Sequence, residues 1–584
     1  MASGSPAPAL VQCRPGWLVK RKKSVRKIWR IRDSNPSVQD TLASALNISK
    51  VTAQLLANRG VSDADTASKF IGCSLAACHD PFLLKGMDKA VARIKKAIAA
   101  KERILIYGDY DVDGMTSVTL VYSALKGLGG NIETYIPNRI EEGYGLNLAA
   151  IKRAHRDGVA LIITVDCGIT SFKEIEHANA AGIDVIVTDH HEILEGRIPP
   201  ALAVINPLQP DCAYPFKHLA GVGLAYKLVK GLYEGTPNFA EDYLDLVSLG
   251  TVADIAPLLG ENRILTKHGL SELNRRGRTG LKALMEASGL SGKDISSGHI
   301  GFVLGPRINA MGRVGSPQKA LDLLLSESLE EALVLAKVLN TENRNRQKIE
   351  AKILDEALAK VEREVNFKHH RVIVLASEGW HPGVIGIVAS RIADRFYRPA
   401  IMISLDGKLG KGSGRSIENF HLFEYLLRCK DTLVGFGGHE AACGITIEKD
   451  RIGDFRDRIN EEAAKDVDES IFSEKLDIEM DIPLDMLSES LIGEIENLSP
   501  FGTENPRPVL SSRNLIVKDG PRQIGKNGFK IWVTDNRITC EAVSFGRNNI
   551  DIPKTGSTVD LAYTPSINNW QGVQSIQLEL HDIK

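Results

Sequence analysis

Three short apolar runs, at residues 104–107, 161–165 and 185–188, each end in residues that can bind a metal ion or move a proton. The first run leads into three aspartates, the second into one, and the third into an aspartate followed by two histidines: Asp109, Asp111, Asp113, Asp166, Asp189, His190 and His191. So many like charges repel one another in a shared pocket unless divalent cations neutralise them. Carboxylates and imidazoles without a thiolate favour Mn²⁺ or Mg²⁺ over zinc, so we expect a pair of such ions here.

The apolar runs themselves predict the elements that position these residues. They are short, rich in β-branched side chains and closed by Gly or Asp, which is typical of buried parallel strands. Helical segments alternate with them from residue 101 to about residue 260, which predicts an α/β fold with a parallel sheet covered by helices on both faces. Ligands bind beyond the carboxyl ends of such strands, so these side chains should meet at one edge of one sheet.

Each motif has a simpler interpretation when it is taken alone. Alternating aspartates in an extended stretch would all lie on one side, but the same pattern also occurs in calcium loops of the EF-hand type. Such a loop requires a glutamate at its twelfth position and a preceding helix, whereas here that position is Leu120 and a strand is expected first. A lone Asp166 or Asp254 is typical of a turn or a helix cap, and only the neighbouring strand ends favour a site.

The two adjacent histidines indicate a division of roles. In an extended segment His190 and His191 point to opposite sides, so one can bind a metal while the other faces a substrate. Two divalent ions about 3.5–4 Å apart activate water and hold the leaving oxygen during in-line attack on phosphorus. The residues therefore predict hydrolysis of a phosphoester or phosphoanhydride bond.

Bulk properties limit the class of protein. The chain has 584 residues and a formal net charge of −1, which predicts several domains and confines any surface for a polyanion to a local patch. It contains no run of 18 apolar residues, and no apolar segment follows the basic residues near its start, so neither a membrane span nor a secretory signal is expected. Its eight cysteines form no Cys-x-x-Cys pair, which favours a reduced, cytoplasmic protein.

The remaining pattern divides the chain into further parts. Residues 1–40 are expected to form a flexible basic tail, with Trp17 and Lys20–Lys23, although a nucleic-acid-binding arm is the alternative. Short alternating strands with Gly, Asn and Pro turns predict a small β-barrel of the OB-fold type at the C-terminus. The expected boundaries are 41–100 for a helical segment, 101–265 for the first α/β domain, 266–365 for a helical region ending in a long connecting helix over 328–365, 366–465 for a second α/β domain, and 470–584 for the barrel.

The motifs together resemble a known superfamily. The segments 108–114, 165–168, 189–191 and 252–254 resemble the four phosphoesterase motifs of the DHH superfamily, and Gly435-Phe-Gly-Gly-His439 resembles the associated DHHA1 domain. More narrowly, the segments 307–313, 380–386 and 413–416 resemble the RecJ family of bacterial exonucleases. The resemblance covers about residues 45–584, and Met311 departs from it because the family commonly has a small residue there.

The resemblance implies roles for the matching residues. The implied metal ligands are Asp109, Asp111, Asp113, Asp166, His190 and Asp254, and Asp166 would bridge the two ions. Asp111, Asp166 and His191 are the implied catalytic residues, and His191 would contact the scissile phosphate or protonate the leaving group. Arg139 would bind the terminal 5′-phosphate through its planar guanidinium group. The other implied substrate-binding residues are Arg307, Asn309, Arg313, Arg415, Ser416 and His439.

The resemblance also implies an activity and partners. The protein would be a single-stranded-DNA-specific 5′→3′ exonuclease, using two metal ions, in DNA recombination and repair. Its expected partners are single-stranded DNA with a 5′ end, a helicase and a single-strand-binding protein, and the expected state is a monomer. The barrel would bind the strand by base stacking and backbone charge. Trp532 and Phe545 are candidates for stacking, but a role in the barrel core is favoured, and the barrel's expected basic residues are Arg513, Lys518, Arg522, Lys526 and Lys530.

Three other functions compete with this one. A phosphodiesterase of the same superfamily would act on nano-oligonucleotides, phosphoadenosine phosphate or cyclic dinucleotides, but such chains are shorter and lack the final β region. Manganese pyrophosphatases resemble only the first domain. A non-enzymatic scaffold would have lost its metal ligands, whereas every expected acidic and imidazole position is filled in this sequence.

Overall fold

The computed structural model describes residues 27–139, 142–143, 145–236, 239–275, 277–525, 528–546, 550–570 and 572–584. Trp17, Lys20–Lys23 and Lys526, which we singled out above, lie outside these residues. The chain divides into two compact units. Residues 37–472 and 494–507 form one of them, and residues 1–36, 473–493 and 508–584 form the other. We call them the catalytic unit and the barrel unit.

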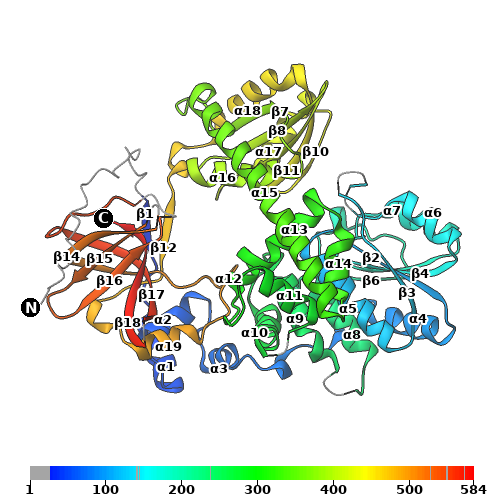
Figure 1. Cartoon of the computed structure of the whole chain (residues 1–584), viewed down its shortest axis with the longest axis horizontal. Coiled ribbons are helices and arrows are strands. Elements are labelled where there is room, and N and C mark those ends of the chain that lie inside the picture. The colour runs from blue at the N-terminus through cyan, green and yellow to red at the C-terminus, as the bar shows by residue number, and fades with distance from the viewer. Residues whose placement is uncertain are drawn as a thin grey trace, which may run out of the picture. The chain divides into compact units, whose positions relative to one another are not determined.

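A parallel sheet of five strands in the order β3-β2-β4-β5-β6 organises the first part of the catalytic unit (Figure 1). Alternate side chains of its strands enter two cores. Ile104 and Ile106 pack with one set of helices, whereas Leu105 and Tyr107 pack with another on the opposite face. The predicted doubly covered parallel sheet is therefore confirmed. The strands are β2 (Arg103–Gly108), β3 (Asn131–Tyr135), β4 (Val159–Val165), β5 (Asp184–Thr188) and β6 (Ala203–Ile205).

Helices cover both faces of this sheet. On one face lie α4 (Met87–Ala99), α5 (Val112–Gly127), α8 (Gly221–Leu232) and α9 (Leu244–Ala253). On the other face lie α6 (Leu148–Arg156) and α7 (Phe172–Ala180). The predicted helix at 171–181 matches α7, with Ser171 as its N-cap residue.

A helical region leads from this sheet to the second α/β domain. It comprises α10 (Gly260–Arg275), α11 (Thr279–Ala287), α12 (Ser297–His299), the π-helical turn η5 (Ile300–Leu304), α13 (Gly305–Val314), α14 (Pro317–Leu325) and α15 (Leu329–Glu364). The last of these spans 36 residues and is the predicted connecting helix. Ser328 caps it by accepting a hydrogen bond from the backbone N–H of Glu331, and no Gly or Pro interrupts it.

The second α/β domain has a mixed sheet in the order β10-β11-β9-β8-β7. Only β7 (Ile373–Glu378) and β8 (Ala400–Asp406) are parallel, and the other neighbours pair antiparallel. The remaining strands are β9 (Leu409–Arg415), β10 (Gly435–Gly438) and β11 (Ala442–Glu448), and the helices are α16 (Ile385–Phe396), α17 (Leu422–Arg428) and α18 (Ile452–Asp466). Helix α16 packs on one face of the sheet, and α17 and α18 pack on the other.

The N-terminal helices pack within the catalytic unit against the segment 494–507. They are α1 (Pro36–Leu46), α2 (Lys50–Asn58) and α3 (Ala64–Gly72). The Glu494 carboxylate accepts hydrogen bonds from Ser49 and Thr52 at 2.6–2.8 Å. The buried Arg263 guanidinium donates to the carbonyl oxygens of Leu498 and Ser499 at 3.0 and 2.8 Å. These contacts fix the segment 494–507 to the catalytic unit.

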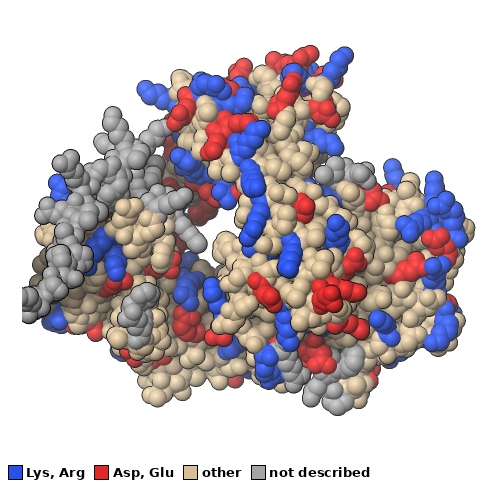
Figure 2. Space-filling view, viewed as in Figure 1, with Lys and Arg blue, Asp and Glu red and all other residues tan. Residues whose placement is uncertain are grey.

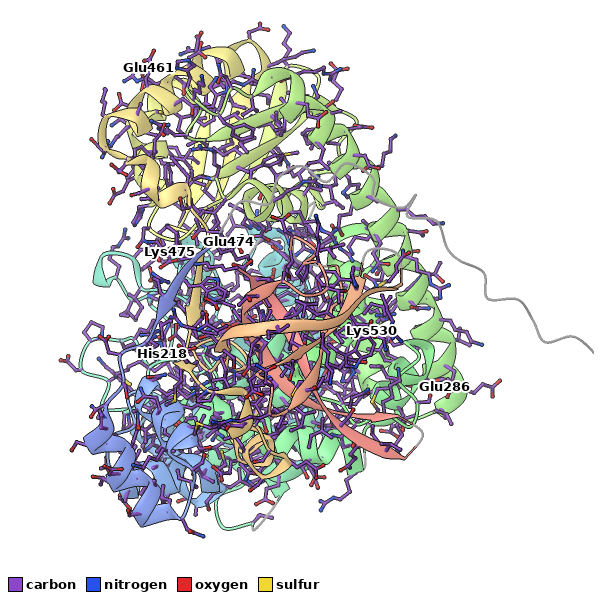
Figure 3. The ribbon with its side chains drawn as sticks, turned by 90° about the vertical axis from the view of Figure 1, so that its left-hand side faces the viewer. His218, Glu286, Glu461, Glu474, Lys475 and Lys530 are labelled. Carbon is purple, nitrogen blue, oxygen red and sulfur yellow. The ribbon has the colours of Figure 1, made fainter. Side chains whose placement is uncertain are left out.

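The barrel unit is a closed sheet. Its order is β13-β14-β15-β16-β18-β17, and pairing of β17 with β14 closes it, as expected for an OB-fold. Glu474 and Lys475 lie where β12 begins (Figure 3). The strands are β12 (Lys475–Ile478), β13 (Met480–Asp481), β14 (Leu510–Ile524), β15 (Gly528–Thr534), β16 (Thr539–Ser544), β17 (Thr558–Trp570) and β18 (Val573–Ile583), and α19 (Glu489–Glu496) precedes β14.

Two expectations about the barrel unit do not hold. Residues 28–31, which we placed in a flexible tail, form β1 (Ile28–Ile31), a parallel partner of β12. Backbone hydrogen bonds to Glu474 and Ile478 and a bond from the Trp29 indole N–H to Asp582 hold the segment in place. Trp532 does not fill the barrel core. Its neighbours Ile531 and Val533 do, since strand residues alternate between faces, and the Trp532 ring is half-buried beneath the Arg522 guanidinium, 4.4 Å from the ring centroid. Phe545 is also outside the core, with 57% of its surface exposed.

No helix among the described residues is long and apolar enough to cross a membrane.

Candidate metal centre and anion site

The three acidic segments meet because their strands end in register. Gly108 of β2 pairs with Val165 of β4, and Val165 pairs with Thr188 of β5. Asp109, Asp166 and Asp189 therefore follow three adjacent strands at the same edge of the sheet. Asp254, the C-cap residue of α9, joins them from the covering helices. The predicted convergence is confirmed for these positions.

The first aspartate loop is not extended, in contrast to our expectation. Helix α5 begins at Val112, so Asp111 is its N-cap residue and accepts a hydrogen bond from the Gly114 backbone N–H at 3.0 Å. Asp113 lies in the first turn, where the helix dipole favours a carboxylate. A Cβ atom at Gly114 would lie 2.5 Å from the Asp109 carbonyl oxygen, so only glycine permits this tight turn. The turn, rather than strand alternation, brings the three carboxylates to one place.

The six predicted metal ligands form overlapping groups. Asp109, Asp111 and Asp166 make one group, and Asp113, His190 and Asp254 make another, with the ligand atoms of each group within 4.8 Å of one another. Asp166 also groups with His190 and His191. The His190 Nε2 atom lies 3.1 Å from Asp166 Oδ1 and 3.8 Å from both Asp113 Oδ2 and Asp254 Oδ2. Asp166 therefore stands between the two groups, where a bridging ligand is expected.

The chemistry of this donor set fits divalent cations. Burial and the neighbouring carboxylates raise the pKa of Asp109 to about 8, of Asp113 to about 7 and of Asp254 to about 9. Burial lowers the pKa of His190 to about 4, so its imidazole is neutral and can offer a lone pair. Among the described residues, the buried Oδ1 atom of Asp109 has no hydrogen-bond donor. A cation would satisfy these groups, and the mixture of oxygen and imidazole donors suits Mn²⁺ or Mg²⁺.

His191 differs from His190 in its protonation state. Its Nδ1 lies 2.7 Å from Asp189 Oδ1, and that carboxylate also accepts from the backbone N–H groups of His191 and Ile169. Burial opposes a charge on His191, but the bond to Asp189 outweighs it and raises the pKa of His191 to about 9. The side chain is 42% exposed. A protonated imidazole at the open side of the acidic cluster can contact a phosphate or give a proton to a leaving oxygen.

A second cluster, of opposite charge, lies in the same unit. Burial and the nearby Arg139, Arg346 and Arg415 guanidinium groups lower the pKa of Arg313 to about 10. Arg313 donates to the Gly383 carbonyl oxygen at 3.2 Å, and Arg415 donates to the Gly414 carbonyl oxygen at 2.7 Å. The Arg139 guanidinium lies 5.1 Å from the centroid of the Tyr110 ring. A gathering of guanidinium groups of this kind suits an anion, and a phosphate matches their planar donors.

Sequence reasoning missed Arg346 as a member of this cluster. It lies on α15, where its guanidinium is paired with Glu350 at 2.6 Å and with Asn343. The only signal was an arginine between two polar residues in the middle of a helix, and this pattern is usually a solvated face.

The other predicted substrate-binding residues have protein partners. Arg307 donates to Asn340 Oδ1 at 3.1 Å and to the Val303 carbonyl oxygen at 2.6 Å. Asn309 Oδ1 accepts from the Val112 backbone N–H at 3.2 Å, so it supports the start of α5. Ser416 donates to the Phe420 carbonyl oxygen at 2.6 Å, and His439 Nδ1 lies 3.8 Å from Glu192 Oε2. Met311 is buried in the core, so the departure from the family pattern lies away from any exposed surface.

Comparison with known proteins matches all three parts of the chain. Residues 103–251 match the DHH family N-terminal domain, residues 369–465 match the DHHA1 domain, and residues 478–582 match the RecJ OB domain.

Two of the similar curated proteins carry the same description. The single-stranded-DNA-specific exonuclease RecJ of Bacillus subtilis is 40% identical over 561 residues, which are 95% of this chain and 70% of that protein. The Escherichia coli protein of the same name is 36% identical over 575 residues, 94% of this chain and 98% of the relative. Among solved structures, RecJ from Thermus thermophilus in complex with Mn²⁺ superimposes with a TM-score of 0.83 at 29% identity, covering 95% of this chain and 79% of that one.

Proposed function

The chain belongs to the RecJ family, and on that premise we propose that it is a single-stranded-DNA-specific exonuclease that removes nucleotides from the 5′ end. The observation that carries the proposal is that one unit holds two clusters of charged side chains, one acidic and one basic. The acidic cluster suits cations as ligands, and the arginine cluster suits an anion. A strand whose terminal phosphate occupies the arginines would present a following linkage to the acidic cluster.

The metal ligands in this proposal are Asp109, Asp111, Asp113, Asp166, His190 and Asp254. When bound there, two divalent ions supply an activated water and stabilise the charge on the phosphate and the leaving oxygen. The relatives solved with Mn²⁺ and Mg²⁺ support the choice of ions. Asp111 and Asp113 are held in place by the first turn of α5, and Asp113 accepts from the Gly221 and Val222 backbone N–H groups at 2.7 and 2.8 Å.

His191 and the arginines divide the substrate contacts. His191, protonated through its bond to Asp189, would contact the scissile phosphate and give a proton to the leaving oxygen. Arg139, Arg313 and Arg415 would hold the terminal 5′-phosphate, with Arg307, Ser416 and His439 along the same path. Asn309 would act by positioning the start of α5, given its bond to Val112.

The barrel unit supports action on long strands rather than on dinucleotides. The Arg522 guanidinium and the Lys530 ammonium group lie 4.4 and 4.9 Å from the centroid of its outward Trp532 ring, and Lys530 is visible on β15 (Figure 3). An aromatic ring flanked by cations suits an unpaired base and its phosphate. A cyclic-dinucleotide or nano-oligonucleotide phosphodiesterase has no use for such a unit, and this alternative is not favoured.

The activity calls for partners that supply a free single strand. We propose a role in DNA recombination and repair beside a helicase and a single-strand-binding protein, with a monomeric enzyme. Co-purification with each partner, and the mass of the protein in solution, would test these points.

Digestion of an end-labelled single strand tests the function. With Mn²⁺, a 5′ label should be released first as a mononucleotide, while a 3′ label should stay on progressively shorter products. Chelator and the Asp166→Ala variant should each abolish release, whereas Asp450→Ala, which changes an exposed carboxylate on the second α/β domain, should behave as wild type. Release of the 3′ label first, or full activity in chelator, would contradict the proposal.

A further inference from the structure

Phe302 is a large apolar side chain in an unusual place. It lies on the π-helical turn η5, and 82% of its surface is exposed. π-helical turns are rare, and where they interrupt α-helices they frequently mark a functional position. Burying the ring would be worth about 2 kcal/mol, so the fold gains nothing from leaving it in water.

Ile255 is a second apolar residue in a costly position. It directly follows Asp254 at the end of α9, with a positive φ of 62° and 69% of its surface exposed. The Ile255 N–H bonds to the Val252 carbonyl oxygen, and the Ala256 N–H bonds to that of Thr251, which is the Schellman pattern that usually has glycine at this point. A β-branched residue in this conformation is strained, and such strain clusters at functional sites.

The two residues lie on segments that pack together beside the acidic cluster. A Cβ atom on Gly301 would lie 4.0 Å from Val252 Cγ1, and one on Gly305 would lie 3.3 Å from Ala253 Cβ. The turn that carries Phe302 therefore rests on the end of α9 that carries Asp254 and Ile255.

Helix α13 connects this apolar end to the arginine cluster. Continuing from η5, Asn309 bonds to Val112, a Cβ atom on Gly312 would lie 2.6 Å from the Tyr110 carbonyl oxygen, and Arg313 belongs to the arginine cluster. The axial distance from Phe302 to Arg313 is roughly 16 Å. The acidic loop thus lies alongside a helix with arginine at one end and exposed apolar groups at the other.

We propose that Phe302 and Ile255 bind the nucleobases of the strand on the 3′ side of the bond that is cut. The inference rests on the proposed function. If the terminal phosphate occupies the arginines and the following linkage lies at the acidic cluster, the continuing strand leaves past Asp254 and η5. Bases are the fitting occupant, because every base offers a flat face to an aromatic ring whatever the sequence.

The charges beyond Phe302 suit the same strand. Arg307, five residues further along, lies close enough to Arg344 that burial and the charge of Arg344 lower its pKa. Lys348 and Lys352 follow Arg344 at intervals of four residues on α15, so the three exposed side chains share one face of the helix. Figure 2 shows a row of Lys and Arg side chains in the region where Figure 1 draws α15. Phosphates would follow these cations while the bases contact the apolar pair.

A matched set of variants and substrates tests the inference. Binding in Ca²⁺ and degradation in Mn²⁺ are measured for wild type, Phe302→Ala, Phe302→Trp and Ile255→Asn, with Leu329→Ala as an exposed apolar control on α15. Each is tested on a 5′-phosphorylated single strand and on the same strand with abasic sites just 3′ of the first linkage. Phe302→Ala should bind the normal strand roughly tenfold more weakly, and Phe302→Trp and Leu329→Ala should bind as wild type does.

The abasic strand separates base contact from a structural effect. Wild type should lose affinity for it, and Phe302→Ala should lose little more, because the contact is already absent. The salt dependence of Phe302→Ala should match wild type, whereas Arg307→Ala should show a shallower slope through the loss of one phosphate contact. Equal losses on both strands, or no loss on either, would overturn the inference. Failure of wild-type protein to degrade any single strand would instead overturn the proposed function.

Discussion

The acidic cluster and the arginine cluster carry opposite charges but share one physical feature. Each gathers like charges in a partly buried place, at a cost in repulsion and lost hydration. In the acidic cluster this cost appears as carboxylate pKa values between about 7 and 9. In the arginine cluster it appears as the Arg313 pKa of about 10. Each cluster is therefore poised for a ligand of opposite charge, cations in one and a phosphate in the other.

The clusters differ in how they are built. The acidic cluster comes mainly from adjacent strand ends and one helix cap within a single sheet. The arginine cluster gathers one residue from each of four segments: the loop after β3, α13, α15 and β9. The first should survive any change that preserves the sheet, whereas the second depends on the packing of the two α/β domains. Changes to the two clusters should accordingly have different consequences.

Removing a charge from the acidic cluster should have the largest effect. Asp166→Asn keeps the shape of the side chain but weakens the group with Asp109 and Asp111 and the group that includes His190, so turnover should fall by a factor of about 1,000 or more. The metal-free variant should be about as stable as wild type, because burial and the neighbouring carboxylates raise the pKa of Asp166 well above its usual value, so that the wild-type side chain is already neutral there. Turnover assays and thermal melting in chelator measure the two effects. Near-wild-type turnover would mean that Asp166 is not a shared ligand.

The effect of bound metal on stability should depend on pH, because both act on the carboxylates of the acidic cluster. Between about pH 4 and 9 the folded metal-free protein keeps protons on Asp109, Asp113 and Asp254 that the unfolded chain has released, so its free energy of unfolding should fall as pH rises. Bound ions require deprotonated carboxylates, so Mn²⁺ affinity should rise over the same range. At 100 times its Kd, an ion should add about 2.7 kcal/mol.

Melting temperatures at pH 6 and pH 8.5, with Mn²⁺ and with chelator, measure this prediction. The difference between the melting temperature with Mn²⁺ and the melting temperature with chelator should be larger at pH 8.5 than at pH 6. A gap that stays constant would show that the carboxylates are already ionised in the metal-free protein, and the account of the acidic cluster would need revision.

A change in the arginine cluster should cost less and should depend on the substrate. Arg139→Ala removes one charged contact, worth about 1.5–3 kcal/mol, so kcat/KM on a 5′-phosphorylated strand should fall roughly 10- to 100-fold. On a strand that ends in a 5′-hydroxyl, the variant and wild type should converge. Parallel assays on the two strands provide the measurement, and Lys408→Ala, on the exposed turn between β8 and β9, is the control. An equal loss on both substrates would assign Arg139 a structural role.

The same difference in construction explains what the sequence could predict. The acidic cluster followed from strand periodicity and from the rule that parallel strands end at one edge, so the positions of Asp109, Asp166 and Asp189 were foreseeable. The conformation of the loop was not. Asp111 and Asp113 were expected in an extended stretch, but an aspartate before an apolar helix also serves as an N-cap, and that preference prevailed.

Residues placed by packing between distant segments could not be predicted in this way. Arg346 joins the arginine cluster only because α13 and α15 pack together, and no local pattern reveals this. Trp532 was expected in the barrel core but lies on the outer face of the barrel. The register of β15 decides its face, and one residue of shift would have reversed the outcome. Strand β1 was hidden in a basic segment because its partner β12 is distant in sequence.

A change at Ile255 should have the smallest effect. It tests whether the free-energy cost near the acidic cluster is purely electrostatic. Its strain comes from the backbone, since φ is 62° at a β-branched residue. Ile255→Asn places a residue that tolerates this conformation at an exposed position, so the free energy of unfolding should rise by about 1 kcal/mol. The nearby charges are unchanged, so Mn²⁺ affinity should stay the same, while affinity for single strands should fall. Chemical denaturation measures the first quantity and titration the others. A variant that is less stable than wild type would show that the Ile255 side chain supports the fold, and the strain would then need no functional explanation.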